Sequence, residues 1–403
     1  MTNEMKNVPE LRFSEFDGEW EQNYIGSYIK ELKMFDTQQG SGFSIATSSR
    51  KGLFKQEDYF DGERTFSKND VLYSIVPPNF ITYRHMSDDN IFKFNINSFN
   101  ENLLVSKEYP VFDVNNQADK KFVFYELNNN INFLKFCIKQ KKGGTRTRLY
   151  FNVLEKYKTF FPILLEQQKI GNFFSKLDRQ IELEEQKLEK LEEQKKGYMQ
   201  KIFSQELQFK DKITNNFDNW SEFKIKDIIS KIESGNRLPK NNLIDGDIPY
   251  VIAQTTNNGV YMNISKDTLD YHGNNLKKFK KGSITISIDN PDAMFIQKHD
   301  FVTSNVMRVL YNENLSIEAH TFILYSLRKL TQTFNWSVKF SGPIIMDSKI
   351  KLPVKLNTND INWNIVNKIG GFLTKLDFKI YQNTTKVELL KHRKKGLLQK
   401  MFV

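Results

Sequence analysis

Residues 169–203 read KIGNFFSKLDRQIELEEQKLEKLEEQKKGYMQKIF, and residues 368–402 read KIGGFLTKLDFKIYQNTTKVELLKHRKKGLLQKMF. A constant offset of 199 positions relates the two stretches, and 17 of their 35 positions are identical without a gap. Such a long-range repeat indicates that the chain is built from two equivalent halves. The starts of the halves are also alike, because Trp20 recurs as Trp220. The chain therefore reads as a domain and a helix, followed by a second domain and a second helix.

Both stretches have the apolar spacing of a long helix that packs along one seam. Apolar residues recur at alternating steps of four and three, and polar residues interrupt them at the same two places in each stretch. A generic helical hairpin or a dimerisation stalk has the same spacing, but the gapless repeat favours two helices that pair within the chain. The predicted seam contains Leu177, Ile181, Glu184, Leu188, Leu191 and Lys195 in the first helix and Ile380, Asn383, Val387, Leu390, Lys394 and Leu397 in the second.

The segments between the helices read as mixed α and β structure. Residues 71–76 and 282–288 look like buried strands that end at turn residues, and residues 319–330 look like a helix. The predicted fold class is α/β (α+β), with two mixed domains separated by two long helices in a pseudo-twofold duplication. The predicted segments are a first domain over 1–161, a first helix over 162–205, a second domain over 206–353 and a second helix over 354–403.

The amino-acid composition indicates the cellular environment in which the chain is expected. The single cysteine, Cys137, lies in an apolar segment, so we expect a buried thiol and no disulfide framework. The chain has no apolar run long enough to cross a bilayer, and residues 1–10 have no apolar signal-peptide core. We therefore expect a cytoplasmic protein without membrane contact.

The net charge of +11 suggests a polyanionic partner. Most of the surplus lies in residues 361–403, which hold nine Lys or Arg against two Asp or Glu. Residues 1–163 hold 22 against 21, and residues 204–360 hold 20 against 17. Bulk charge therefore does not make the two domains DNA binders, and local clusters are needed.

Polar and basic loops between the predicted elements supply such clusters. Arg can read guanine, Asn can read adenine, and Lys binds phosphate as a point charge, although solvated surface loops have the same composition. The most distinctive loop is 139–148, which joins five cations to two glycines that let backbone approach a ligand closely. The candidate DNA contacts are Ser49, Arg50, Lys51, Arg84, Lys141, Lys142, Thr145, Arg146, Arg148, Asn236, Arg237, Thr255, Thr256, Asn257, Asn258, Lys339 and Ser341.

Linear motifs of catalysis are missing from the sequence. It has no phosphate-binding Gly-x-x-x-x-Gly-Lys loop, no dinucleotide fingerprint and no Asn-Pro-Pro-aromatic element of an adenine methyltransferase. The five histidines are scattered and have no zinc-ligand spacing. A Ser/His/Asp triad is a spatial arrangement without a linear motif, and nothing in the sequence favours one. We therefore expect no catalytic residue, no metal and no cofactor bound by this chain.

Several motifs resemble the specificity subunits of type I restriction-modification systems. Val8–Phe13 followed by Gly18–Glu21 resembles the opening of that family's first recognition domain. Residues 148–154 leading into 161–170 resemble the exit from that domain into the family's conserved helix, and residues 396–403 resemble its C-terminus. The likeness covers essentially the whole chain.

One departure concerns the second exit. The pair Glu166 and Gln167, just before the first repeat, has no counterpart in residues 359–367 before the second. The second exit from domain to helix is therefore built differently.

The resemblance implies a non-catalytic subunit that binds a bipartite site on double-stranded DNA. Each variable domain would be a target-recognition domain for one half-site, and the paired helices would be antiparallel. Two methyltransferase subunits that bind S-adenosylmethionine would dock on this scaffold, and restriction subunits that use ATP and magnesium would complete the complex. A helix of 35 residues is roughly 50 Å long and would span about 15 base pairs, which suits a ruler between half-sites.

Antiparallel pairing about a local twofold axis predicts a register. Glu184 would face Lys394, and Lys195 would face Asn383, so that polar layers meet polar layers. Two other functions remain as alternatives. A helical adaptor without DNA specificity would show no salt-dependent DNA binding. A self-contained restriction-methylation enzyme is disfavoured because it would need the missing motifs.

Overall fold

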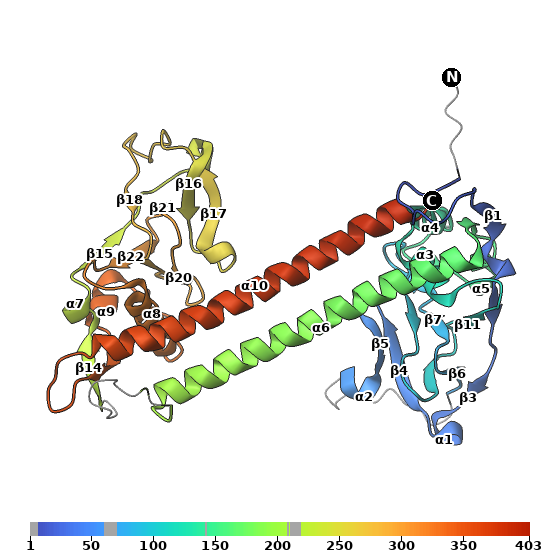
Figure 1. Ribbon diagram of the computed structural model, residues 1–403, viewed down its shortest axis with the longest axis horizontal. Helices are drawn as coiled ribbons and strands as arrows, with labels where there is room; N and C mark the ends of the chain where they lie inside the picture. The colour runs from blue at the N-terminus through green and yellow to red at the C-terminus, as the bar shows by residue number, and fades with distance from the viewer. Residues whose placement is uncertain (1–6, 60–70, 142, 208, 210–218) are drawn as a thin grey trace. The chain divides into compact units, whose positions relative to one another are not determined.

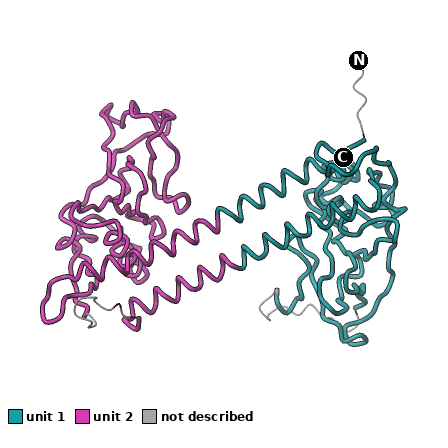
Figure 2. The backbone as a smooth tube through the Cα atoms, viewed as in Figure 1, with its two compact units in different colours: residues 1–186, 385–403 teal, residues 187–384 magenta. Residues whose placement is uncertain are grey.

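The chain forms two compact units, shown in different colours in Figure 2. Unit 1 consists of residues 1–186 and 385–403, and unit 2 consists of residues 187–384. Each unit contains one mixed α/β segment together with part of each long helix. Unit 1 is therefore assembled from stretches that lie far apart in the sequence.

The structure, a computed structural model, describes residues 7–59, 71–141, 143–207, 209 and 219–403. Within this part of the chain, no helix is long and apolar enough to cross a membrane.

Two long helices carry the repeated sequence. They are α6 (Leu164–Phe203) and α10 (Trp363–Met401) (Figure 1). Helix α10 begins nine positions after the start of the segment predicted for it, because Val354 still belongs to the last strand of unit 2. The predicted seam positions in both helices are buried or half-buried, whereas residues 182, 183, 185 and 186 beside them are exposed. The heptad pattern thus identifies the face along which each helix packs.

The helix segments of each unit run antiparallel. In unit 1, Asp178 of α6 pairs with Lys394 of α10, and Glu185 pairs with Lys391 at 2.6 Å, so numbers rise in one helix as they fall in the other. In unit 2, Lys195 pairs with Asp377 at 2.6 Å.

The predicted register is wrong. Lys394 reaches Asp178 instead of Glu184, Lys195 reaches Asp377 instead of Asn383, and Glu184 pairs with Lys386. Each of the two lysines therefore meets an acid six positions away from the predicted partner. The prediction assumed that polar seam residues face one another. All three pairs are displaced in the same direction by six to eight positions, so the helices are shifted by about one heptad from the predicted pairing and the lysines meet aspartates beside the seam.

Unit 1 contains two main sheets. The first is antiparallel, in the order β2 (Ile29–Glu31), β11 (Val111–Val114), β7 (Ile81–Tyr83) and β9 (Phe94–Ile96). The second has one parallel pair, β10 with β4, in the order β3 (Phe35–Asp36), β6 (Tyr73–Val76), β10 (Leu103–Ser106), β4 (Ser44–Ser49) and β5 (Gly52–Lys55). Two short antiparallel pairs are β1 (Glu21–Tyr24) with β13 (Lys158–Phe161), and β8 (Met86–Ser87) with β12 (Thr147–Arg148).

Unit 2 repeats this strand order, except that its mixed sheet has no counterpart of β3 among the described residues. Its antiparallel sheet has the order β15 (Lys231–Ser234), β22 (Met307–Tyr311), β19 (Ile284–Ser287) and β20 (Met294–Ile296). Its mixed sheet has the order β18 (Lys278–Phe279), β21 (Phe301–Thr303), β16 (Asp245–Val251) and β17 (Val260–Ile264), again with the central pair parallel. The pair β14 (Asn219–Lys224) and β23 (Lys349–Val354) corresponds to β1 and β13. The duplication predicted from the helices therefore extends through both domains.

One domain helix in each unit packs on the long helices. In unit 1 it is α3 (Lys120–Asn129), and in unit 2 it is α8 (Ile317–Thr331). Trp20 meets Phe122 of α3 at a ring distance of 5.8 Å, and Trp220 meets Phe322 of α8 at 5.6 Å. The remaining helices are α1 (Gln38–Ser41), α2 (Gln56–Tyr59), α4 (Ile131–Lys139), α5 (Phe151–Leu154), α7 (Ile225–Ile228) and α9 (Gly342–Asp347).

The repeated glycines near the start of each seam permit this packing. A Cβ on Gly171 would lie 3.0 Å from the backbone nitrogen of Phe122, and a Cβ on Gly370 would collide with the carbonyl oxygen of Glu318. Cys137 is buried in the core of unit 1, as predicted, and burial raises the pKa of its thiol to about 12.

The two exits from domain to long helix use different residues. In unit 1, Arg12 donates two hydrogen bonds of 2.7 Å to the fully buried carboxylate of Glu166. Gln167 accepts a hydrogen bond from the backbone of Asp119, which caps α3. In unit 2, the hydroxyl of Ser316, which caps α8, donates to Asn367 at 2.8 Å. The missing Glu-Gln pair is thus replaced by another polar link at the same place.

Candidate nucleic-acid interface

Three loops of unit 1 meet at one corner of the domain. They are the turn between β4 and β5, the segment 84–90 that follows β7, and the loop 143–148. Pairing of β12 with β8 brings the third loop to the second, and Arg146 binds Asp88 at 2.8 Å. Arg50 in the turn binds Asp89 at 2.5 Å. The structure therefore brings together residues that are nearly 100 positions apart, and we call this set of loops the unit 1 corner.

Acidic residues hold the cations of this corner in place. Asp89 accepts hydrogen bonds from Arg50 and from the hydroxyl of Ser87, and these interactions lower the pKa of Asp89 from 3.8 to about 2. Arg50 and Arg146 nevertheless stay 61% and 51% exposed, so both guanidinium groups can still meet a ligand. The two aspartates were not among the predicted DNA contacts, because a carboxylate repels the phosphates of DNA.

Other predicted contacts of unit 1 lie on the same loops. Ser49 accepts a hydrogen bond from the backbone of Lys51, and the amide of Asn95 fixes the turn through Ser48. Gly143 and Gly144 have positive φ values of 66° and 75°, which allow the sharp backbone path of the third loop. Lys142 lies outside the described residues. The exposed candidates that complete the corner are Lys51, Arg84, Thr145 and Arg148, whereas Lys141 is exposed just after the end of α4 (Ile131–Lys139) and outside these loops.

The corresponding corner of unit 2 is formed by uncharged polar residues. The segment between β16 and β17 contains Asn257 and Asn258, both with positive φ, and Gln297 donates to the carbonyl of Asn258 at 3.0 Å. At the end of β19, Ser287 donates to Asp289, as Ser87 does to Asp89 in unit 1. This second contact lies at the other end of the β19–β20 hairpin from Gln297, so we call only the segment 252–259 the unit 2 corner. Its exposed candidates are Thr255, Thr256 and Asn257, while Asn258 is half-buried.

The third loop of unit 2 reaches the end of β19 through a backbone hydrogen bond. Phe340 donates to the carbonyl of Ile288 at 2.7 Å, in the same way that Leu149 donates to His85 in unit 1 at 2.8 Å. This bond places the exposed Lys339 near the end of β19, at the other end of the β19–β20 hairpin from Asn258. Ser341 is half-buried and occupies the cap position of α9.

Two predicted contacts of unit 2 have other surroundings. The side-chain amide of Asn236 donates to Asp270 at 2.8 Å, and its oxygen accepts from the backbone of Lys277 at 2.8 Å. Both polar atoms of Asn236 are thus engaged within the domain, which accounts for it as a structural residue. Arg237 is exposed and lies over the ring of Tyr271 at 4.7 Å.

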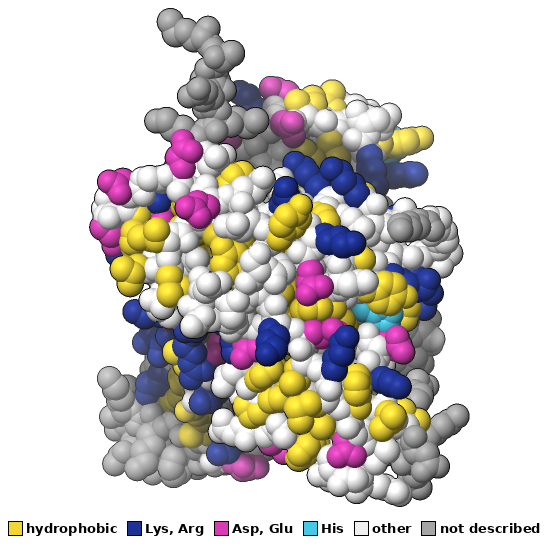
Figure 3. Space-filling model, turned by 90° about the vertical axis from the view of Figure 1, so that its right-hand side faces the viewer, with side chains coloured by type: hydrophobic (Ala, Val, Ile, Leu, Met, Phe, Trp, Pro, Cys, Tyr) yellow, Lys and Arg dark blue, Asp and Glu magenta, His cyan; other side chains and the backbone are white. Residues whose placement is uncertain are grey.

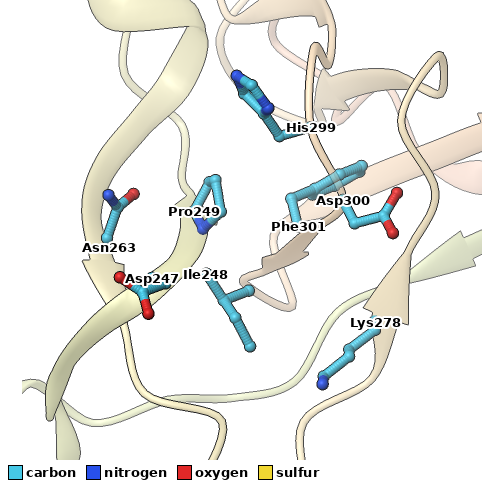
Figure 4. A pocket seen from close by; sticks show the side chains of 8 residues that line it. All are labelled: Asp247, Ile248, Pro249, Asn263, Lys278, His299, Asp300 and Phe301. Atoms are coloured by element: carbon cyan, nitrogen blue, oxygen red, sulfur yellow. The ribbon is translucent and has the colours of Figure 1, made fainter.

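A hollow of about 510 Å³ opens between β16 and β21 of unit 2 (Figure 4). Charges of both signs line it, and no group of three or more possible metal ligands occurs among the described residues. The lining residues are Asp247, Ile248, Pro249, Asn263, Lys278, His299, Asp300 and Phe301. Figure 3 shows a face of the molecule on which Lys and Arg are interspersed with Asp and Glu, in agreement with the balanced charge counts of the domains.

Comparisons with known proteins identify the class. The family model of the type I restriction modification DNA specificity domain matches residues 33–193 and again 217–386. Two such domains on paired helices define a specificity subunit of a restriction-modification system. The chain belongs to the family of type I restriction modification DNA specificity domains.

Individual relatives are more distant. The specificity subunit S.BcgI of the type II restriction enzyme BgcI from Heyndrickxia coagulans is 27% identical over 173 residues, which are 42% of this chain and 47% of that protein. The chain thus spans about half the length of this curated relative. The S subunit of a type I restriction-modification system from M. genitalium has the same fold, with a TM-score of 0.64 at 15% identity over 98% of this chain and 99% of that one. The HsdS subunit from Thermoanaerobacter tengcongensis aligns with a TM-score of 0.40 at 13% identity over 95% and 96% of the two chains.

Proposed function

We propose that this chain is the non-catalytic DNA-specificity subunit of a type I restriction-modification complex, and that each unit reads one half of a bipartite site on double-stranded DNA. The observation that carries this proposal is the convergence of three loops with exposed arginines at one corner of unit 1, in a chain whose second domain repeats the same antiparallel sheet. One corner presents exposed arginines and the other presents exposed amides and hydroxyls, which are the groups that read base edges.

The proposed partners are those that the family resemblance implies. Two methyltransferase subunits that bind S-adenosylmethionine dock on this chain and methylate adenine, and restriction subunits that use ATP and magnesium join the complex. The repeated helix segments support docking of two equivalent partners, because each partner can meet the same sequence. Methyl transfer by the purified chain alone, in the presence of S-adenosylmethionine, would contradict the non-catalytic role.

The proposal is tested with the full chain and duplex DNA. The half-sites are first identified by mapping methylated adenines after co-purification with the methyltransferase subunit. Arg50→Ala and Arg146→Ala are then compared with Lys158→Ala, which removes an exposed cation from β13, outside the unit 1 corner. The two corner variants should weaken binding, and the control should not.

The way in which DNA affinity is lost distinguishes base reading from phosphate contact. Loss confined to sequences that carry the first half-site indicates base reading, and uniform loss with a shallower salt dependence indicates phosphate contact. Unchanged affinity and salt dependence in both arginine variants would refute the placement of DNA at this corner. Binding without any salt dependence would favour the adaptor alternative.

A further inference from the structure

A three-residue node joins the domain of unit 1 to both long helices. The hydroxyl of Tyr125, on α3, donates to the carboxylate of Asp178 on α6 at 2.7 Å. The ammonium group of Lys394, on α10, pairs with the same carboxylate and lies 5.5 Å from the centre of the Tyr125 ring. Three elements from separate parts of the sequence therefore meet at one aspartate.

Unit 2 contains the same node with the two long helices exchanged. Tyr325, on α8, donates to Asp377 on α10 at 2.7 Å. Lys195, on α6, pairs with Asp377 at 2.6 Å and lies 5.0 Å from the centre of the Tyr325 ring. The aspartate thus comes from α6 in unit 1 and from α10 in unit 2.

The members of the node recur even where the sequence diverges. The aspartate and the lysine belong to the helical repeat at its offset of 199 positions. The tyrosine lies in the domains, where only scattered residues recur, and its offset is 200. Packing alone explains an aromatic ring at this place, just as it explains Phe122 and Phe322, which contact Trp20 and Trp220. Packing does not require the hydroxyl group, so the hydrogen bond to the aspartate needs a separate reason.

The surroundings of the nodes make their polar contacts directional. Both lysine side chains are only 24% exposed, and the aspartates are 39% and 41% exposed. Hydrogen bonds and ion pairs that are partly shielded from water are stronger and depend more on geometry than exposed ones. Rotation of a domain on its helices would separate the tyrosine from the aspartate, while sliding of one helix along the other would separate the lysine.

We propose that each node is the joint that fixes the angle of its domain on the helix pair, and that the two joints together determine which spacing between half-sites the chain accepts. This inference rests on the proposed function, because only a chain that reads two half-sites has a preferred spacing. The residues of the node act as positioning residues and do not contact DNA.

The chain offers a matched control for this inference. Glu185 of α6 pairs with Lys391 of α10 at 2.6 Å, and this ion pair joins the two helices without a domain residue. Glu185→Gln therefore weakens helix pairing alone. The double variant Tyr125→Phe with Tyr325→Phe keeps both rings and removes only the two hydroxyl groups.

The experiment measures the affinity of the full chain for duplexes in which the two mapped half-sites are separated by the preferred spacer or by one base pair more or fewer. The double tyrosine variant should bind a duplex with a single half-site as well as the unaltered chain does. Its preference for the best spacer should fall by at least about tenfold, because the variant loses two hydrogen bonds to charged groups and each alone is worth about that factor. Glu185→Gln should keep the preference.

The possible results of this experiment distinguish a role of the nodes as joints from a purely stabilising role. A lower melting temperature with an unchanged spacer preference would show that the nodes only stabilise the fold and would overturn the inference. An equal loss of spacer preference in Glu185→Gln would show that helix pairing in general determines the preferred spacing. That result would overturn the inference as well. Absence of sequence-specific binding by the unaltered chain would refute the proposed function itself, which the single half-site duplex reveals independently.

Discussion

The two units have the same strand order, yet their recognition corners are chemically different. The unit 1 corner carries arginines that are held by Asp88 and Asp89. The unit 2 corner carries a turn in which Asn257 and Asn258 both have positive φ. The sheets therefore determine where the loops lie, and the loop sequences determine which groups they present. Under the proposed function, divergence of the loops on a retained scaffold would let one chain read two different half-sites.

The largest expected effect concerns the junction between domain and long helix, where the two units use different residues. Glu166 of unit 1 is fully buried and paired with Arg12, whereas the position at the same offset in unit 2 is the buried Ile365. Arg12→Ala leaves the carboxylate buried without its partner and should destabilise the chain by about 3–5 kcal/mol in denaturant unfolding. Arg12→Met combined with Glu166→Ile removes both charges and places at position 166 the residue that unit 2 has at the same offset, so it should recover most of that loss. Equal stability of Arg12→Ala and the unaltered chain would contradict the structural role of this pair.

The repeated glycines give a smaller effect with an internal control. Ala at Gly370 would collide with backbone, and Ala at Gly171 would press on α3, so each should cost about 1–3 kcal/mol, with Gly370 the more sensitive. Nothing lies within 4 Å of a Cβ at Gly197 or Gly396. Ala at these two helical positions should instead stabilise the chain by about 0.5–1 kcal/mol. Thermal melting of the four variants measures the contrast, and the same sign for all four would contradict the packing described.

The chemistry of the two corners predicts different DNA-binding defects. Arg146→Ala should weaken binding and make its salt dependence shallower, since a cation is lost. Asn258→Gly keeps the positive φ of the turn and removes only the amide. It should lower discrimination at the second half-site by about 1–3 kcal/mol for each base read, without changing the salt dependence. Affinity measured at several salt concentrations distinguishes the two, and a salt effect of Asn258→Gly would contradict the assignment.

The smallest expected effect is a titration in the unit 1 corner. The pKa of Asp89 falls to about 2 because Arg50 and Ser87 bind its charged form. The stabilising contribution of this pair is therefore complete above the usual value of 3.8 and is lost as the pH falls toward 2. In NMR titrations, Arg50→Ala should raise the midpoint of Asp89, and so should DNA that binds Arg50. A midpoint that stays near 2 in Arg50→Ala would show that Ser87 and the backbone dominate.

The repeat predicted the helices, the duplication and the seam, because heptad spacing depends on local sequence alone. The register could not be predicted in the same way. It depends on Asp178 and Asp377, which lie beside the seam and were not counted with it. A pattern of polar seam residues shows which face of a helix is buried, but it does not show how far a long side chain extends from that face.

The candidate interface could be predicted only in part. The loops that converge at the unit 1 corner and the segment 252–259 of unit 2 were predicted as contacts because they are rich in Arg, Lys and Asn. Asn236 was selected for the same reason, yet its amide is used within the domain, since composition does not distinguish a structural amide from a free one. Asp89 and Asp88, which pair with Arg50 and Arg146, are close to them only in the folded chain. No linear sequence motif predicts these pairs.

The assembly of unit 1 from distant stretches has a consequence for biosynthesis. Leu398, Met401 and Phe402 belong to its core, and Phe402 lies 5.3 Å from Phe122 between ring centres. A nascent chain emerges from the ribosome with its first domain and α6 long before these residues are made. The apolar surface that they cover stays exposed until the whole second domain has been synthesised. Contacts at such sequence separation also form slowly. We therefore expect unit 2 to mature first, although it is translated second.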